Sequence, residues 1–73
     1  MSQIYTGVTA MTIGEQVKVW RLKECYSLAE MAALVGVHRS TLELIEEGRH
    51  RPRYKTRRGL AKAMGLTPEE LQA

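Results

Sequence analysis

Cysteine is nearly absent from this sequence, which contains only Cys25 among its 73 residues. No disulfide can form within the chain, so its core must be held together by packing alone. We therefore expect a cytoplasmic protein. Cys25 has no histidine nearby in the sequence, and we interpret it as a structural or incidental thiol rather than a nucleophile or redox sensor.

Long apolar runs, export signals and clustered metal ligands are also missing. The apolar stretches are far shorter than the roughly 20 residues that a membrane span requires, and no basic start precedes an apolar core near residue 1. His38 and His50 lie 12 positions apart, without a cysteine or carboxylate at ligand spacing. We expect no membrane contact, no metal and no cofactor. No group of residues is arranged for catalysis, so we do not expect an enzyme.

The composition favours a small domain with an anionic partner. A chain of this length hides only roughly 60% of its unfolded surface, which leaves little room for a large substrate cavity. Eleven Lys and Arg against eight Asp and Glu give a net charge of +3 and an isoelectric point of about 9.4. This balance favours a polyanion as the partner.

Residues 1–11 differ from the rest because they carry no charged side chain. Ile4, Tyr5 and Val8 follow neither a helical nor a clean strand pattern. The segment fits either a flexible tail or an extended arm that pairs with a partner chain. We take 1–11 as an N-terminal arm and 12–73 as the folded domain.

Capping signals divide the domain into helices. Thr12 and Glu15 have the spacing of a capping box and predict a helix over 13–24. Its apolar face is expected to include Ile13, Val17, Trp20 and Leu22, and its solvent-exposed face to include Arg21. Three further segments have helical signals, over 28–35, 39–47 and 54–64. Thr67, Pro68 and Glu70 predict a short last helix. The sequence thus predicts an all-α, compact five-helix domain.

Gly36 interrupts an apolar helical pattern in "MAALVGVHRSTLELIEEG", residues 31–48. Glycine adopts the left-handed backbone conformation that ends a helix without steric cost. Two short helices joined by a tight glycine turn form a helix-turn-helix, in which Ala32 supplies the small residue where they cross. The apolar residues expected to lock the pair are Met31, Val35, Val37, Leu42 and Ile45.

The stretch "SLAEMAALVGVHRSTLELIEEG", with "IGEQVKVWRLKE" before it and "RPRYKTRRGLAKAMGLTPEEL" after it, resembles the DNA-binding domain of lambdoid phage repressors and Cro proteins. The resemblance covers about residues 13–71. It implies a lambda-repressor-like fold in which helix 39–47 enters the major groove. The residues that it implies at bases are Arg39, Ser40, Glu43 and Leu44, and those at the DNA backbone are His38, Thr41, Arg49, His50, Arg51 and Arg53.

The chemistry of these side chains agrees with those roles. Arginine reads guanine through two hydrogen bonds to O6 and N7, and leucine can touch a thymine methyl group. Arg49 opens a stretch with six Lys and Arg and no acidic residue through Arg58. We interpret it as a phosphate-binding surface, with a solvated basic face as the alternative. Glu46 and Glu47 are expected to pair with arginines at the surface.

Two positions depart from the family pattern. Relatives often have glutamine at the first residue of the second helix, where this chain has Leu28, which packs either on a DNA sugar or inside the fold. Arg57 stands where relatives bury an apolar side chain. Either its stem runs along the core or its helix is rotated.

The sequence therefore predicts a sequence-specific transcriptional regulator, such as a phage-type repressor or a Cro-like protein, that binds double-stranded DNA. One helix-turn-helix reads only a few base pairs, so we expect a homodimer with half-sites about 34 Å apart. Its contacts are expected at Leu66 and Leu71, with Ile4 and Tyr5 as further candidates. The alternative is a protein-binding adaptor, such as an antirepressor or antitoxin component, and a regulatory protein partner is compatible with both readings.

Overall fold

Four helices make up the part of the chain that the computed structural model describes, residues 12–71. They are α2 (Ile13–Lys23), α3 (Leu28–Val35), α4 (Arg39–Glu46) and α5 (Tyr54–Met64). No strand occurs between residues 12 and 71, so the all-α class is confirmed. The N-terminal arm, with Ile4 and Tyr5, lies outside the described residues.

The helices begin and end where local chemistry dictates. At the start of α2, the Thr12 hydroxyl accepts from the Glu15 amide at 3.2 Å, and the Thr12 amide donates to Glu15 Oε1 at 3.0 Å. This reciprocal box satisfies amides that have no partner inside the helix. At the other end of the domain, Gly65 has a φ of 72° and ends α5. The predicted bounds of α2 to α5 agree with the structure to within one residue.

The prediction of a short fifth helix after the N-cap Thr67 is wrong for the described residues, which end at Leu71. Its capping box does form, because the Thr67 amide donates to Glu70 Oε1 at 2.8 Å. The backbone then makes only i to i+3 hydrogen bonds, from Glu70 to Thr67 and from Leu71 to Pro68. These residues form a turn that places Leu71 in the core. A cap satisfies the first amides, but a helix of one turn gains too few further hydrogen bonds to persist.

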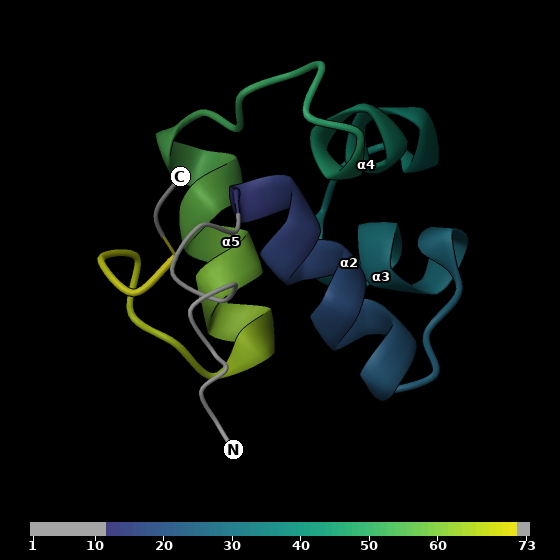
Figure 1. The fold of residues 1–73 in the computed structure, drawn as a ribbon, viewed down its shortest axis with the longest axis horizontal. Helices are drawn as coiled ribbons and strands as arrows, with labels where there is room; N and C mark the ends of the chain where they lie inside the picture. Colours follow the sequence, from purple (N-terminus) through teal and green to yellow (C-terminus); the bar gives the residue numbers. More distant parts are fainter. Residues whose placement is uncertain (1–11, 72–73) are drawn as a thin grey trace.

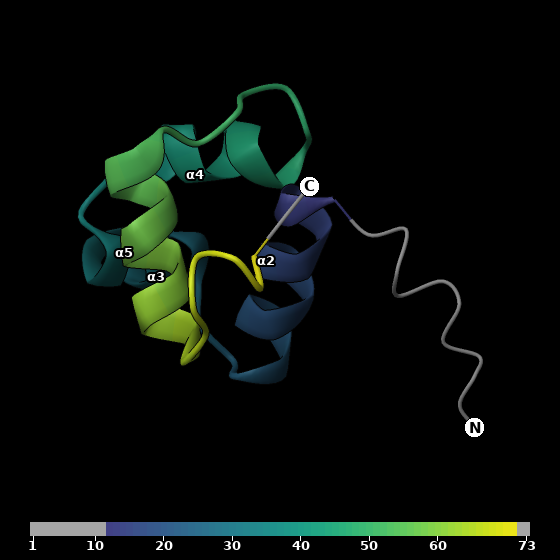
Figure 2. The same cartoon turned by 90° about the vertical axis from the view of Figure 1, so that its left-hand side faces the viewer.

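The core lies where α4 packs on α2 and α3, and α3 packs on α5. Its fully buried large side chains come from every helix and from the final turn: Val17, Met31, Leu42, Ile45, Leu60 and Leu71. Figures 1 and 2 show the loop between α4 and α5 arching over one end of the molecule. The core therefore packs against one side of α4, and the end of the molecule that carries α4 and this loop faces solvent.

The inward stripe of α2 contains Ile13 and Val17, as predicted, but differs from the prediction at Arg21 and Leu22. Ile13, Val17 and Arg21 are buried, whereas Leu22 is 57% exposed and Trp20 is only half-buried. Residues four apart lie on one helical face, so the stripe follows the spacing 13, 17 and 21. Arg21 is thus an inward residue, and the interpretation of it as part of the wet face is wrong.

The two departures from the family pattern are resolved inside the fold. Leu28 is half-buried and packs against the core, so it lies inside the fold. Arg57 is half-buried, and its Nε donates to the carbonyl of Leu71 at 3.2 Å. Its stem therefore runs along the protein while its charged end fastens the final turn to α5.

Candidate nucleic-acid interface

The turn between α3 and α4 is fixed by backbone hydrogen bonds. Gly36 has φ 86° and ψ 34°, the left-handed conformation, and its amide donates to the carbonyl of Ala32 at 2.8 Å. The amide of Val37 donates to the same carbonyl at 3.0 Å. Ala32 itself is buried where the helices meet. The predicted helix-turn-helix geometry is confirmed, and it determines the direction in which α4 leaves the turn.

A capping box at the start of α3 holds the other side of the motif. The amide of Ser27 donates to Glu30 Oε1 at 2.9 Å, and the Ser27 hydroxyl accepts from the Glu30 amide at 3.0 Å. The hydrogen bond from the Ser27 backbone, followed by that with its side chain, lowers the pKa of the Glu30 carboxyl below its usual value. A negative charge here also favours the helix N-terminus.

Helix α4 has two distinct faces. Leu42 and Ile45 are at most 1% exposed and bind it to the core. The opposite face carries the four residues predicted to contact bases, of which Arg39 and Ser40 are exposed, Leu44 is 40% exposed and Glu43 is half-buried. The structure thus brings these four side chains together on one accessible surface, which we call the outward face.

A nearly buried ion pair fastens the C-terminal end of α4 to α2. Arg21 Nε and Glu46 Oε2 lie 2.7 Å apart, and Arg21 NH2 donates to Glu46 Oε1 at 3.0 Å. The remaining guanidinium nitrogen, NH1, donates to the carbonyl of Tyr26 at 2.9 Å. The hydrogen bond to Glu46 raises the pKa of Arg21 above its usual value, although burial opposes the rise. Glu46 is thus paired as predicted, but inside the protein rather than at its surface.

Sequence reasoning missed a second contact between the same two helices. A Cβ added to Gly14 would overlap the carbonyl oxygen of Ile45 and lie 2.9 Å from that of Glu46. The start of α2 therefore packs directly on the backbone at the end of α4. The signal in the sequence was a glycine inside a predicted helix, where glycine is otherwise unfavourable.

The N-terminal end of α4 has no side-chain cap. His38 occupies the N-cap position, as expected, but its side chain makes no capping hydrogen bond. Thr41 is half-buried in the first turn, and this turn contains no acidic residue. Amides at such a helix start favour an anion, and a DNA phosphate is one.

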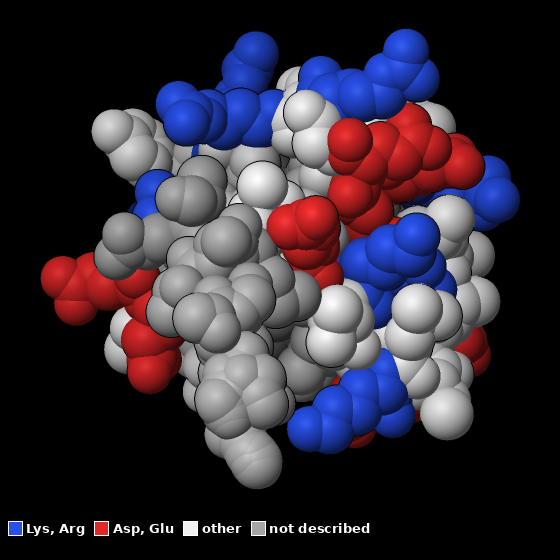
Figure 3. All heavy atoms as spheres, in the orientation of Figure 1, with Lys and Arg blue, Asp and Glu red and all other residues white. Residues whose placement is uncertain are grey.

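The loop after α4 carries three exposed arginines and an exposed histidine. Arg49, His50, Arg51 and Arg53 are all exposed, and Arg49 lies 3.6 Å from Glu47 in a surface ion pair. Figure 3 shows Lys and Arg atoms along the edge formed by this loop, with acidic atoms directly beside them over α4. The loop and α4 therefore lie at the same end of the molecule.

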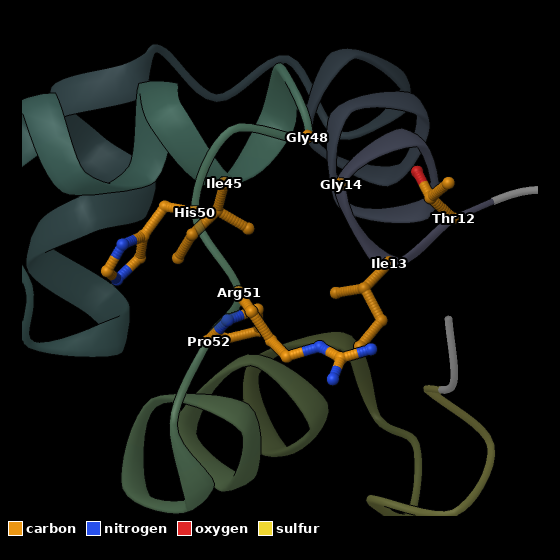
Figure 4. Close-up of a pocket in the computed structure, with 8 residues that line it drawn as sticks. All are labelled: Thr12, Ile13, Gly14, Ile45, Gly48, His50, Arg51 and Pro52. Carbon is orange, nitrogen blue, oxygen red and sulfur yellow. The ribbon is translucent and has the colours of Figure 1, made fainter.

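An open pocket of about 200 Å³ lies between this loop and the start of α2. It is lined by Thr12, Ile13, Gly14, Ile45, Gly48, His50, Arg51 and Pro52. Figure 4 shows the side chain of Arg51 extending toward Ile13, while that of His50 leaves the loop in another direction. The pocket offers little polar surface for a small molecule, and two of its lining residues, His50 and Arg51, remain exposed.

The predicted dimer contacts have different positions in the fold. Leu71 is 0% exposed, because it fills the core of its own chain, and its side chain is not available to a partner. We therefore correct that assignment. Leu66 is half-buried and packs against the core at one edge.

Neither a metal centre nor a membrane span is visible in the described part of the chain. Within residues 12–71, no three His, Cys, Asp or Glu side chains lie together in a way that could hold a metal ion. None of the helices found there is both long and apolar enough to cross a bilayer.

Comparison with known proteins identifies the motif. Residues 12–73 match a family model described as a helix-turn-helix domain. SinR, described as the master regulator for biofilm formation and solved in complex with DNA, is 28% identical, with a TM-score of 0.74 over 82% of this chain and 97% of that one. No curated protein matches the chain.

Two further structures share the fold but belong to longer chains. A SinR and SinI complex contains a chain that is 28% identical, with a TM-score of 0.74 over 82% of this chain. The clp gene regulator ClgR from Corynebacterium glutamicum is 20% identical, with a TM-score of 0.72 over 81% of this chain. The present chain spans only 59% and 63% of these two relatives.

Proposed function

The chain belongs to the helix-turn-helix domain family, and from this premise we propose that it is a sequence-specific DNA-binding regulator of transcription. The observation that carries the proposal is the outward face of α4, which holds Arg39, Ser40, Glu43 and Leu44 on a helix fixed to the core. A rigid helix with exposed polar side chains fits the major groove of DNA. The relative solved with DNA, SinR, supports the same assignment.

The neighbouring loop supplies the complementary charge. Its arginines are exposed at the same end of the molecule as α4, and we expect them to contact phosphates while α4 contacts base edges. His38 and Thr41, at the open start of α4, would hold a further phosphate. Such contacts release counterions and give DNA affinity that is independent of sequence.

In this proposal the protein acts as a homodimer in the cytoplasm, where it reaches DNA. It regulates by binding and catalyses no reaction. Two copies would place their α4 helices on half-sites about 34 Å apart. Of the two leucines predicted at the dimer contact, Leu66 remains, and Ile4 and Tyr5 stay candidates outside the described residues. A phage-type repressor or a Cro-like protein is the finer assignment that we favour.

The second candidate is a protein-binding adaptor. SinR forms a complex with the protein SinI, and the outward face here includes an apolar and an acidic side chain, Leu44 and Glu43. A protein partner could occupy the same end of the molecule. The two functions differ in their response to salt, because only DNA binding releases a condensed counterion atmosphere.

Binding isotherms on random and selected duplexes over a series of salt concentrations test the proposal. The protein should bind random DNA at low salt and release it as salt rises. Arg39→Ala should weaken the selected site by about 1–3 kcal/mol with much less effect on random DNA. Arg51→Ala should weaken both by similar factors and make the salt dependence shallower by about one phosphate per protomer.

Lys23→Ala is the matched control, because it removes one exposed cation from the last turn of α2, away from the loop. It should leave both affinities unchanged to within about twofold, as is usual for a surface change outside an interface. If the parent protein binds no duplex even at low salt, the adaptor function replaces DNA binding. If Arg39→Ala keeps the ratio of selected to random affinity, α4 does not read bases through Arg39.

A further inference from the structure

Glu43 places a carboxylate in the middle of the outward face of α4. The side chain is half-buried and makes neither a hydrogen bond nor an ion pair with any residue between 12 and 71. A negative charge at this position is repelled by DNA phosphates and loses water on binding, so it weakens binding unless a hydrogen-bond donor meets it.

The donors available in the major groove limit what Glu43 can meet. An ionised carboxylate only accepts hydrogen bonds. Cytosine N4 and adenine N6 are the donors on the major-groove edges, whereas guanine and thymine present acceptors there. Adenine also places its acceptor N7 beside N6, where it would repel the second carboxylate oxygen, and cytosine has no acceptor at the corresponding place.

We propose that Glu43 makes the protein select cytosine at one position of its DNA site, with the carboxylate accepting from N4. The proposal rests on the proposed function, since it requires that α4 enter the major groove. It deepens that function by assigning a chemical class of base to one side chain. Glu43 is thus a specificity-determining residue, and it excludes guanine and thymine by the repulsion between acceptors.

The position of this cytosine relative to a guanine follows from helix geometry. Arg39 and Glu43 are four residues apart, so they lie on the same side of α4 and about 6 Å apart along its axis. Arg39 is exposed and suited to the acceptors of guanine. Since base pairs are stacked about 3.4 Å apart, the cytosine should lie within about two base pairs of the guanine.

Selection of bound sequences from random duplex DNA, by the full chain and its variants, tests the assignment. The parent protein should enrich a cytosine within about two base pairs of an enriched guanine. Glu43→Gln should change the preference at that position from cytosine to adenine, because an amide pairs with N6 and N7 of adenine. The change should be roughly tenfold or more in relative affinity.

Two further variants complete the experiment. Glu43→Ala should remove the preference and raise the affinity for random DNA, because one repulsive charge is lost. Glu47→Gln is the matched control, since it removes the same charge four residues later, at the C-cap of α4, where the side chain is exposed and paired with Arg49. It should leave the preferred base at the Glu43 position unchanged.

The outcomes separate this assignment from the proposed function. If the parent and both Glu43 variants bind DNA with the same base preferences, the inference is wrong while DNA binding stands. If the parent selects guanine or thymine at the position that the Glu43 variants alter, the acceptor argument is wrong. Absence of any duplex binding by the parent would overturn the proposed function together with the inference.

Discussion

The inward face of α4 carries Leu42, Ile45 and Glu46, and its outward face carries Arg39, Ser40 and Glu43. The inward side chains are buried, and the one charge among them makes an ion pair with Arg21. The side chains on the outward face make no side-chain hydrogen bond or ion pair within residues 12–71. One short helix therefore separates the residues that hold the fold from those available to a partner.

The largest expected effect on stability comes from breaking the ion pair on the inward face. Glu46→Ala leaves the guanidinium of Arg21 nearly buried without its carboxylate, which should cost about 3–5 kcal/mol in the free energy of unfolding. Urea denaturation measures the loss. Replacing both partners, as Arg21→Met with Glu46→Leu, should restore most of it, because no charge is then left unpaired.

A loss below about 1 kcal/mol for Glu46→Ala would show that solvent reaches Arg21 and that the pair does not fasten α4. If Glu46→Ala fails to fold, the double variant still decides between the two outcomes, because it lacks the unpaired charge.

A smaller effect on the free energy of unfolding is expected from separating α2 and α4. Gly14→Ala forces the new Cβ against the backbone of Ile45, so α2 and α4 must move apart at an expected cost of about 1–3 kcal/mol. Gly59→Ala is a suitable control, because its Cβ would lie 3.1 Å from the Val35 carbonyl oxygen, a milder approach. Equal thermal unfolding of the two variants would contradict the close contact between α2 and α4.

Substitutions at Gly36, in the turn before α4, should lower stability only through the backbone conformation that they strain. A Cβ at Gly36 would meet nothing within 4 Å, but the φ of 86° is unfavourable for any other residue. Gly36→Ala should therefore cost about 1–2 kcal/mol. Gly36→Asn should cost less, because asparagine tolerates the left-handed conformation. Calorimetric unfolding of both variants checks this order, and equal stability of the parent and Gly36→Ala would mean that the turn differs.

The smallest effect is expected on the outward face. Ser40→Ala and Glu43→Gln should each change the free energy of unfolding by no more than about 0.5 kcal/mol, as surface substitutions usually do. Their effects belong to DNA binding. A stability loss above 1 kcal/mol in either variant, measured by urea denaturation, would mean that the outward face also holds the fold.

The sequence predicted what depends on neighbouring residues. The capping boxes at Thr12 and Ser27 and the left-handed Gly36 follow from local hydrogen bonding, and all three are confirmed. The outward face of α4 was predictable because the apolar residues on the opposite, inward face follow a helical period. What each of its side chains binds stays a prediction.

Interactions between distant residues could not be predicted in the same way. Arg21 and Glu46 are 25 residues apart, and only the packing of α2 against α4 brings them together. Leu71 is apolar and was predicted at the dimer interface, yet the final turn places it in the core. The burial of Arg21, Glu46 and Leu71 depends on the tertiary fold, which a local sequence pattern does not contain.

The attachment of α4 at both ends has a thermodynamic consequence for recognition. The Gly36 turn fixes its first residues, and Arg21 holds its last turn to α2 and to the carbonyl of Tyr26. A helix that is already preorganised loses little backbone entropy when it binds, so more of the contact energy appears as affinity. The entropic cost of recognition then lies mainly in the rotamers of exposed side chains such as Arg39.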